Sequence, residues 1–166
     1  MPFVIAARES GARRAIKEWP DAHWQAVLDE LAVLRRSIVL VGASVPVTND
    51  TGGGTVVDLR GRTDLPTLAA LCARARLFIG SDSGALHLAA AVGTPVVGIF
   101  GPTDWRRTAP RGVPARIVHV HGGDVSCAPC LRSRCRFADT PTANRRCLTD
   151  ISPRAVIEAA RELLDA

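Results

Sequence analysis

The sequence contains no tyrosine, a single methionine and a single lysine, and aromatic residues make up only 4% of its 166 residues. It has no apolar run of the roughly 18 residues that a membrane-spanning helix needs. Residues 1–7 lack the basic leader of a signal peptide. The apolar fraction of 47% and the charged fraction of 22% exclude disorder, collagen-like repeats and low-complexity sequence. We therefore expect one cytoplasmic domain over residues 1–166.

The formal charge is +5, and nearly all basic residues are arginine. A basic balance favours an anionic partner, such as nucleic acid, a phosphorylated small molecule or a membrane surface. The arginines are scattered, however, and no basic segment is interleaved with aromatic side chains that could stack on bases. We therefore expect a phosphorylated ligand and no nucleic acid.

Apolar strands alternate with helical stretches along the chain. Helix periodicity is clearest after Pro20, where the apolar positions are Trp24, Val27, Leu28, Leu31 and Leu34. The expected strands are 3–7, 38–41, 56–59, 77–79, 96–100 and 117–120. The other expected helices are 65–75, capped by Thr63 or Asp64, 84–92, and a closing helix with Ser152 at its N-cap and Pro153 at its first position. This alternation predicts an α/β fold, a Rossmann-like parallel sheet with helices on both faces. Ligands bind such sheets at the edge where strands lead into helices.

The loop over residues 80–87 is the strongest candidate for chemistry at that edge. Small residues turn the chain from a strand into a helix, so the free N–H groups of Ser83, Gly84 and Ala85 would face outward at the positive end of the helix dipole. Such an end binds phosphate or diphosphate. Gly84 would let the ligand approach the backbone, and His87 lies one turn further on. No GxGxxG is present, so a standard NAD-binding fingerprint is not supported.

Asp82 fits less simply, because a carboxylate beside a diphosphate is repelled. We interpret it as an acceptor for sugar hydroxyls next to the phosphates. The simpler alternative is that Asp82 only caps the helix and that His87 is a satisfied core histidine.

Two further loops belong to the same edge. Gly101 allows a tight turn after the strand at 96–100, and the Thr103 hydroxyl could reach a phosphate, although an ordinary strand-ending turn explains both residues. Lys17 could approach a phosphate as a compact charge. On its own, Lys17 is more simply interpreted as an exposed solubilising lysine.

A cysteine-rich loop spans residues 124–148. Cys127, Cys130, Cys135 and Cys147 are compatible with a tetrahedral Zn–S4 site, and disulfides are disfavoured in a reducing cytosol. The wide spacing of the second pair and the surrounding arginines favour free or redox-active thiols instead. Cys72 lies among apolar residues and is expected in the core.

Four segments carry a resemblance that covers nearly the whole chain. They are Lys-Glu-Trp-Pro at 17–20, Leu-Arg-Gly-Arg-Thr-Asp-Leu at 59–65, Asp-Ser-Gly-Ala-Leu-His-Leu-Ala-Ala-Ala at 82–91 with Gly93 and Pro95, and Phe-Gly-Pro-Thr at 100–103. The Asp-Ser-Gly-x-x-His element with the downstream Gly-Pro-Thr is the specific part. On these residues the chain resembles the C-terminal half of glycosyltransferase family 9, the ADP-heptose:lipopolysaccharide heptosyltransferases, many of which also carry a late cysteine cluster.

The resemblance implies half of a GT-B enzyme, in which two Rossmann-like domains close over a cleft. Such enzymes transfer heptose from ADP-heptose to an inner-core sugar of lipopolysaccharide, with inversion and without a catalytic metal. This half would hold the donor through Lys17, Ser83 and Gly84 on the diphosphate, Asp82 and His87 on the heptose and phosphate side, and the segments near Gly42 and Thr63 on the adenosine.

Two departures from the family pattern limit what this chain can do. The general base of the family belongs to an N-terminal glycine-rich loop that has no match in this sequence. We therefore expect no catalytic residue in this chain and little turnover by this chain alone. Gly42-Ala43-Ser44 also lacks an acidic residue that some members have. The lipid acceptor implies contact with the cytoplasmic membrane face. The alternatives are a domain for a UDP- or GDP-sugar, and a metal- or redox-dependent interaction module built on the cysteine loop.

Overall fold

A computed structural model describes residues 3–8, 15–34, 36–43, 56–120, 125–140 and 143–166. Six parallel strands form one sheet in the order β3-β2-β1-β4-β5-β6. The strands are β1 (Phe3–Ala7), β2 (Ser37–Val41), β3 (Val56–Asp58), β4 (Leu77–Ser81), β5 (Val96–Phe100) and β6 (Ala115–His119). This is the strand order of the doubly wound Rossmann fold, so the predicted fold class is confirmed.

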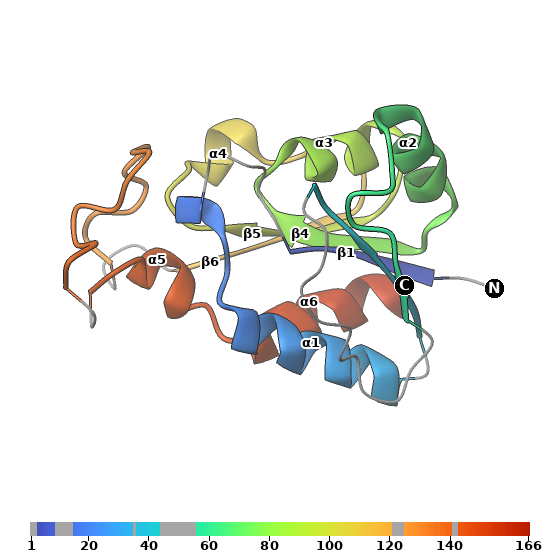
Figure 1. The fold of residues 1–166 in the computed structure, drawn as a ribbon, viewed down its shortest axis with the longest axis horizontal. Helices are drawn as coiled ribbons and strands as arrows, with labels where there is room; N and C mark the ends of the chain where they lie inside the picture. Colours follow the sequence, from blue (N-terminus) through green and yellow to red (C-terminus); the bar gives the residue numbers. More distant parts are fainter. Residues whose placement is uncertain (1–2, 9–14, 35, 44–55, 121–124, 141–142) are drawn as a thin grey trace.

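Helices cover both faces of the sheet (Figure 1). They are η1 (Ala15–Lys17), α1 (Asp21–Val33), α2 (Leu65–Arg74), α3 (Gly84–Ala91), α4 (Trp105–Thr108), α5 (Arg146–Thr149) and α6 (Pro153–Leu164). The central strand β1 shows why both layers form. Val4 and Ala6 pack into the core under α1 and α6, whereas Ile5 and Ala7 pack into the core under α2 and α3. A strand that is buried on both sides needs apolar residues at every position, and β1 has them.

The helix ends follow the predicted capping residues. The Asp64 carboxylate accepts the Thr67 N–H at 2.9 Å at the start of α2, and the Ser152 hydroxyl accepts the Ala155 N–H at 3.3 Å at the start of α6. In α1 the apolar stripe is buried as far as Leu31, but Leu34 follows the last helical residue and is 37% exposed. The sequence pattern placed Leu34 in the apolar stripe of this helix, whereas in the structure it is the C-cap residue.

Several boundaries differ from the sequence prediction. Strand β4 continues to Ser81, because its edge residues still pair with β5, and β6 runs from Ala115 to His119 instead of 117–120. The short helices η1, α4 and α5 were not predicted, since three or four residues show no periodicity. Cys72 is fully buried in α2, as expected, and burial raises the pKa of its thiol to about 11.

The order of the strands reverses once, beside β1. Strands β2 and β3 lie on one side of β1, and β4, β5 and β6 lie on its other side. The loops after β1 and β4 therefore lead away from each other at the carboxyl edge of the sheet. Such a switch point is where ligands bind doubly wound sheets. Within the described ranges, the helices are too short or too polar to cross a membrane.

Candidate functional site

The junction between β4 and α3 forms the centre of the candidate site. Ser83 is the N-cap residue of α3, with extended backbone angles, and its side chain makes no capping hydrogen bond. The first N–H groups of a helix have no partner within the helix, and the Ser83 side chain does not bind those of α3. The predicted phosphate-binding arrangement, a strand followed by a tight turn and a helix N-terminus, is therefore present.

Gly84 leaves this helix end open. Among the described residues, a methyl group at Gly84 would meet no atom within 4 Å. The packing of the described residues thus does not require glycine at this position. The space above the first turn of α3 is available to a ligand, as expected from the sequence.

Lys17 and His87 both bind the carboxylate of Asp82. The Lys17 ammonium lies 2.5 Å from Asp82 Oδ2 and 3.3 Å from the Asp82 carbonyl oxygen. On the other side, His87 Nε2 lies 3.3 Å from Asp82 Oδ1. Lys17 comes from η1 after β1, and Asp82 directly follows β4. The segments that follow these two neighbouring strands therefore bring together three of the predicted residues.

These three side chains differ in how deeply they are buried. Lys17 is 9% exposed and Asp82 6% exposed, so the interpretation of Lys17 as an exposed solubilising lysine is wrong. The His87 side chain is 43% exposed, so His87 is not the core histidine of the alternative interpretation. The Asp82 carboxylate binds Lys17 and His87 instead of capping α3. His87 is thus the member of the three that a ligand can reach most easily.

The pKa of Asp82 lies below its ordinary value of 3.8. Burial acts to raise it, but the hydrogen bond and charge of Lys17, the Thr103 hydroxyl and the hydrogen bond from His87 together outweigh burial. The carboxylate is therefore ionised at neutral pH and neutralises the buried ammonium. Lys17 carries three N–H donors, and among the described residues the contacts given for its ammonium both go to Asp82.

The loop after β5 contributes Gly101 and Thr103. A methyl group at Gly101 would lie 2.5 Å from Leu148 Cγ, so glycine is required here by packing against α5. The Thr103 hydroxyl oxygen is shielded from solvent and meets no described partner at hydrogen-bond geometry. It nevertheless lies close enough to Asp82 to help to lower the pKa of that carboxyl. Thr103 therefore faces the Lys17–Asp82–His87 cluster, and Gly101 keeps the loop in place.

Thr63 and Gly42 lie further along the same edge. The Gly61 N–H donates to the Gly42 carbonyl at 2.8 Å, which joins the loops after β2 and β3. Thr63 is half-buried just before α2. Three strand spacings of roughly 4.8 Å separate β3 from β4, so Thr63 can share a ligand with Asp82 only if that ligand is extended. Ser44 lies outside the described residues.

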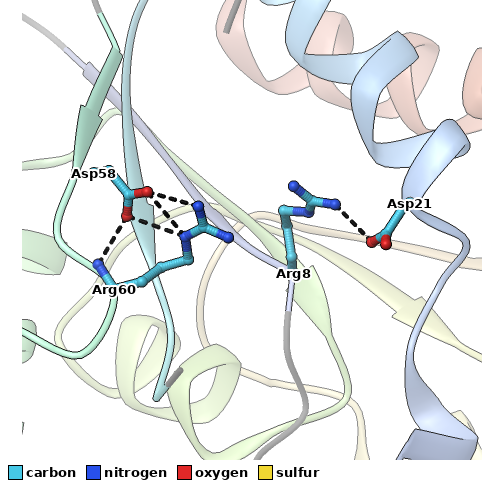
Figure 2. A network of polar contacts seen from close by, with 4 residues as sticks. All are labelled: Arg8, Asp21, Asp58 and Arg60. Atoms are coloured by element: carbon cyan, nitrogen blue, oxygen red, sulfur yellow. Dashed lines mark hydrogen bonds and ion pairs between the residues drawn. The ribbon is translucent and has the colours of Figure 1, made fainter. Parts of the chain in front are cut away.

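Two arginines at this edge were not predicted as site residues (Figure 2). Arg60 follows β3 and binds Asp58 through two nitrogen atoms, with its Nη2 2.6 Å from Asp58 Oδ2. This contact, against the opposing effect of burial, holds the pKa of Asp58 below its ordinary value. Arg8 follows β1 and reaches Asp21 at 2.6 Å. The position of each arginine just after a strand could have indicated that it lies at this edge. Arginine is so common along the chain, however, that this position does not stand out in the sequence.

The four late cysteines line one small pocket together with arginines. Cys127, Cys130, Cys135 and Cys147 share it with Arg136, Arg145 and Arg146. Burial, followed by the charges of the other three cysteines, raises the pKa of Cys147 to about 12. Within the part of the chain that the structure describes, no three histidine, cysteine or acidic side chains are arranged to hold a metal ion. The cysteines are thus gathered in one pocket, as the sequence suggested, and none of them forms a disulfide.

Comparison with known proteins identifies the family of the chain. The model of glycosyltransferase family 9 (heptosyltransferase) matches residues 3–140. The chain belongs to this family. The matched range includes the β4–α3 junction, the Gly-Pro-Thr loop and the first three late cysteines. The resemblance predicted from the sequence is therefore confirmed.

Individual family 9 relatives are considerably longer. The chain is 37% identical over 110 residues to lipooligosaccharide heptosyltransferase 2 of Campylobacter jejuni, covering 66% of this chain and 32% of that protein. It is 32% identical over 155 residues to lipopolysaccharide heptosyltransferase 1 of Pseudomonas aeruginosa, covering 90% of this chain and 41% of that protein. The crystal structure of a family 9 glycosyl transferase from Veillonella parvula matches with a TM-score of 0.77 and 25% identity, over 98% of this chain and 46% of that one. The chain therefore spans less than half the length of these relatives.

Proposed function

We propose that this chain is the donor-binding half of an inverting heptosyltransferase that acts in lipopolysaccharide core biosynthesis, and that its ligand is ADP-heptose. The observation that carries the proposal is the open N-terminus of α3 beside the Lys17–Asp82–His87 cluster, in a chain of the heptosyltransferase family. The first-turn N–H groups supply hydrogen-bond donors and a positive dipole end, which is what a diphosphate requires.

The roles of the site residues follow from their exposure. The N–H groups of Ser83, Gly84 and Ala85 and the ammonium of Lys17 bind the diphosphate. Asp82, only 6% exposed, mainly holds Lys17 and His87 in place, and His87 contacts the phosphate or the heptose. The adenosine extends along the edge toward Gly42 and Thr63.

The chemical step needs groups that this chain does not supply. Inversion requires a base that removes the proton from the acceptor hydroxyl as it attacks the anomeric carbon. By the family resemblance this base belongs to the portion of the relatives that the chain does not span. We therefore expect little or no heptosyl transfer by this chain alone, and the acceptor would be met at the cytoplasmic membrane face. Robust turnover of ADP-heptose with a lipid A–core acceptor would overturn this part of the proposal.

A thermal-shift titration with ADP, with UDP and GDP for comparison, tests the donor assignment. A ligand that binds only the folded state adds about 2.7 kcal/mol of stability at roughly 100 times its Kd. We expect an ADP-selective shift, whereas a larger shift with UDP or GDP would favour the alternative nucleotide sugars. No shift with any nucleotide would overturn donor binding by this chain.

Removing one amide tests where the phosphates bind. Ala85→Pro deletes an N–H in the first turn of α3, a position at which proline is compatible with a helix. Arg154→Pro is the matched control, because Arg154 is likewise the second residue of its helix, α6. We expect the ADP shift to fall in Ala85→Pro alone. Equal shifts in both variants would place the diphosphate elsewhere.

A structural zinc at the cysteine cluster is a separate proposal. Four thiols line one pocket, which favours a metal, although the described side chains are not arranged as a metal site and the arginines favour free thiols. Metal analysis of the purified chain and of Cys127→Ser decides between them. Stoichiometric zinc that is lost in the variant would support the metal, and a metal-free chain would overturn it.

A further inference from the structure

The short segment that carries Lys17 is attached to the C-terminal part of the chain on both sides of the lysine. Ile16 is buried and lines the same pocket as the four late cysteines. On the other side, the indole N–H of Trp19 donates to the Ile151 carbonyl at 3.1 Å, across 132 positions of sequence. The neighbours of Lys17 are therefore held by residues that do not themselves belong to the candidate donor site.

Arg145 makes the attachment closest to Lys17. Its guanidinium Nη1 donates to the carbonyl oxygen of Glu18, the next residue after Lys17, at 3.4 Å. The Arg145 side chain is half-buried and lines the cysteine pocket. Its backbone N–H lies 3.4 Å from Cys135 Sγ. One residue thus connects the cysteine loop with the backbone beside Lys17.

The backbone of Arg145 does not favour arginine at this position. Its φ of 54° and ψ of 32° are left-handed, a conformation that glycine and asparagine adopt more readily than arginine does. Arg145 is also the N-cap residue of α5 and makes no side-chain capping hydrogen bond, whereas asparagine is among the residues preferred there. A residue in an unfavourable conformation points to a role for its side chain. The contact with Glu18 supplies a role that neither the backbone nor the cap explains.

The attachment of the segment affects where the Lys17 ammonium lies. A lysine carries its charge on a flexible chain of four carbons, so the charge is fixed in space only if both ends of the side chain are held. Asp82 holds the ammonium at 2.5 Å, and the contacts of Glu18 and Trp19 hold the backbone. Without the contact from Arg145, Lys17 would be less firmly placed beside the first turn of α3.

We propose that Arg145 is a positioning residue of the donor site, which holds the Glu18 carbonyl and thereby fixes Lys17 where its ammonium meets both Asp82 and the diphosphate. This inference rests on the proposed function, because the diphosphate is assigned to Lys17 there. Arg145 itself acts through Lys17 and does not contact the nucleotide.

Calorimetry with ADP tests the effect on binding. Arg145→Asn removes the guanidinium while keeping a residue that tolerates the left-handed backbone and the N-cap position. We expect ADP binding to weaken about two- to tenfold, the factor that one ordinary hydrogen bond is worth. Arg145→Lys retains a cationic donor and should recover part of the loss. Leu131→Asn is the matched control, since Leu131 belongs to the same loop, also has a φ of 54° and is exposed, and it should bind ADP like the wild type.

A double-mutant cycle with Lys17→Met separates positioning from a general loosening of the fold. If Arg145 acts through Lys17, Arg145→Asn weakens ADP binding in the wild type and adds nothing in the Lys17→Met background. An equal effect of Arg145→Asn in both backgrounds would show that it does not act through Lys17, and would overturn the proposal.

Acylation of the lysine tests the same contact without nucleotide and without the destabilised Lys17→Met variant. Lys17 is the only lysine of the sequence, so its modification by an N-hydroxysuccinimide ester is followed at one peptide by mass spectrometry. The α-amino group of each protein is the internal reference. We expect Lys17 to react about two- to tenfold faster in Arg145→Asn, because local opening of its segment then breaks one hydrogen bond fewer. Leu131→Asn should react at the wild-type rate.

The experiments separate failure of this inference from failure of the proposed function. Faster acylation in Arg145→Asn, together with no binding of ADP by the wild type, would overturn donor binding and leave Arg145 as the residue that holds Lys17. Unchanged acylation in Arg145→Asn, or the same rise in Leu131→Asn, would overturn the role of Arg145 whatever the affinity for ADP.

Discussion

The ammonium of Lys17 lies 2.5 Å from Oδ2 of Asp82, across 65 residues of sequence. Both side chains are largely buried, with 11% of the Lys17 side chain and 7% of the Asp82 side chain exposed. The contact joins the segment after β1 to the residue before the N-cap of α3, on the two sides of the switch point at which the donor is proposed to bind. Since each charge is shielded from water, each depends on the other for compensation.

Removing one partner of this pair should destabilise the chain strongly. We expect Asp82→Asn and Lys17→Met each to lower the free energy of unfolding by about 3 kcal/mol, because the remaining group is left in a poorly hydrated position. The double variant should cost clearly less than the sum of the two. Urea unfolding of all four proteins gives the coupling energy, and strictly additive effects would show that the pair is not the source of the loss.

The lowered pKa of Asp82 predicts a loss of stability in acid. Its contribution is fully present above the unfolded-state value of 3.8 and disappears as the pH falls through the lower pKa of the folded state. Unfolding measured between about pH 5 and pH 2 should therefore show a steeper decline in the wild type than in Asp82→Asn. Asp165→Asn, at an exposed residue after α6, serves as the control and should keep the wild-type slope. Identical slopes in all three proteins would contradict the prediction.

Two glycines should respond in opposite ways to alanine. Gly84→Ala meets open space and improves helix propensity, so the free energy of unfolding should stay the same or rise by at most about 1 kcal/mol while nucleotide affinity falls. Gly101→Ala places a methyl group 2.5 Å from Leu148 Cγ and should cost about 1–3 kcal/mol. Denaturant unfolding and ADP titration of both variants check this contrast. Full nucleotide affinity in Gly84→Ala would mean that no ligand approaches that backbone.

The five cysteines should differ in reactivity toward iodoacetamide. The pKa of about 12 for Cys147 leaves roughly one thiol in ten thousand ionised near pH 8, and only the thiolate reacts. Cys72, with a pKa of about 11 and no exposed surface, should also react slowly. Mass spectrometry of the native chain over time should show modification at Cys127, Cys130 or Cys135 first. Early modification of Cys147 would show that the cysteine pocket opens readily.

Much of the fold could be predicted from local patterns. The strand at Phe3–Ala7, the α1 stripe from Trp24 to Leu31 and the caps at Asp64 and Ser152 each depend on residues close in sequence. Short elements such as α4 and α5 could not be predicted, because they are held by contacts with distant segments. Leu148 of α5, for example, packs against Gly101, which lies 47 positions earlier (148 − 101).

The candidate site could be predicted only in part, for the same reason. The phosphate-binding turn at Ser83 and Gly84 has a local signature, and the family motif pointed to Lys17, Asp82 and His87. The pairing of Trp105 with His119 could not be predicted, since β6 first has to pair with β5 before the two rings meet.

The sequence by itself determined the alternation of strands and helices, the family, and the helix N-terminus that faces the carboxyl edge, because each depends on the identity and spacing of neighbouring residues. Tertiary structure alone decided that Lys17 is buried on Asp82, that Gly84 is open while Gly101 is packed, and that the rings of Trp105 and His119 stack on each other. Burial and pairing are properties of surfaces brought together by the strand order, and a linear pattern does not contain that order.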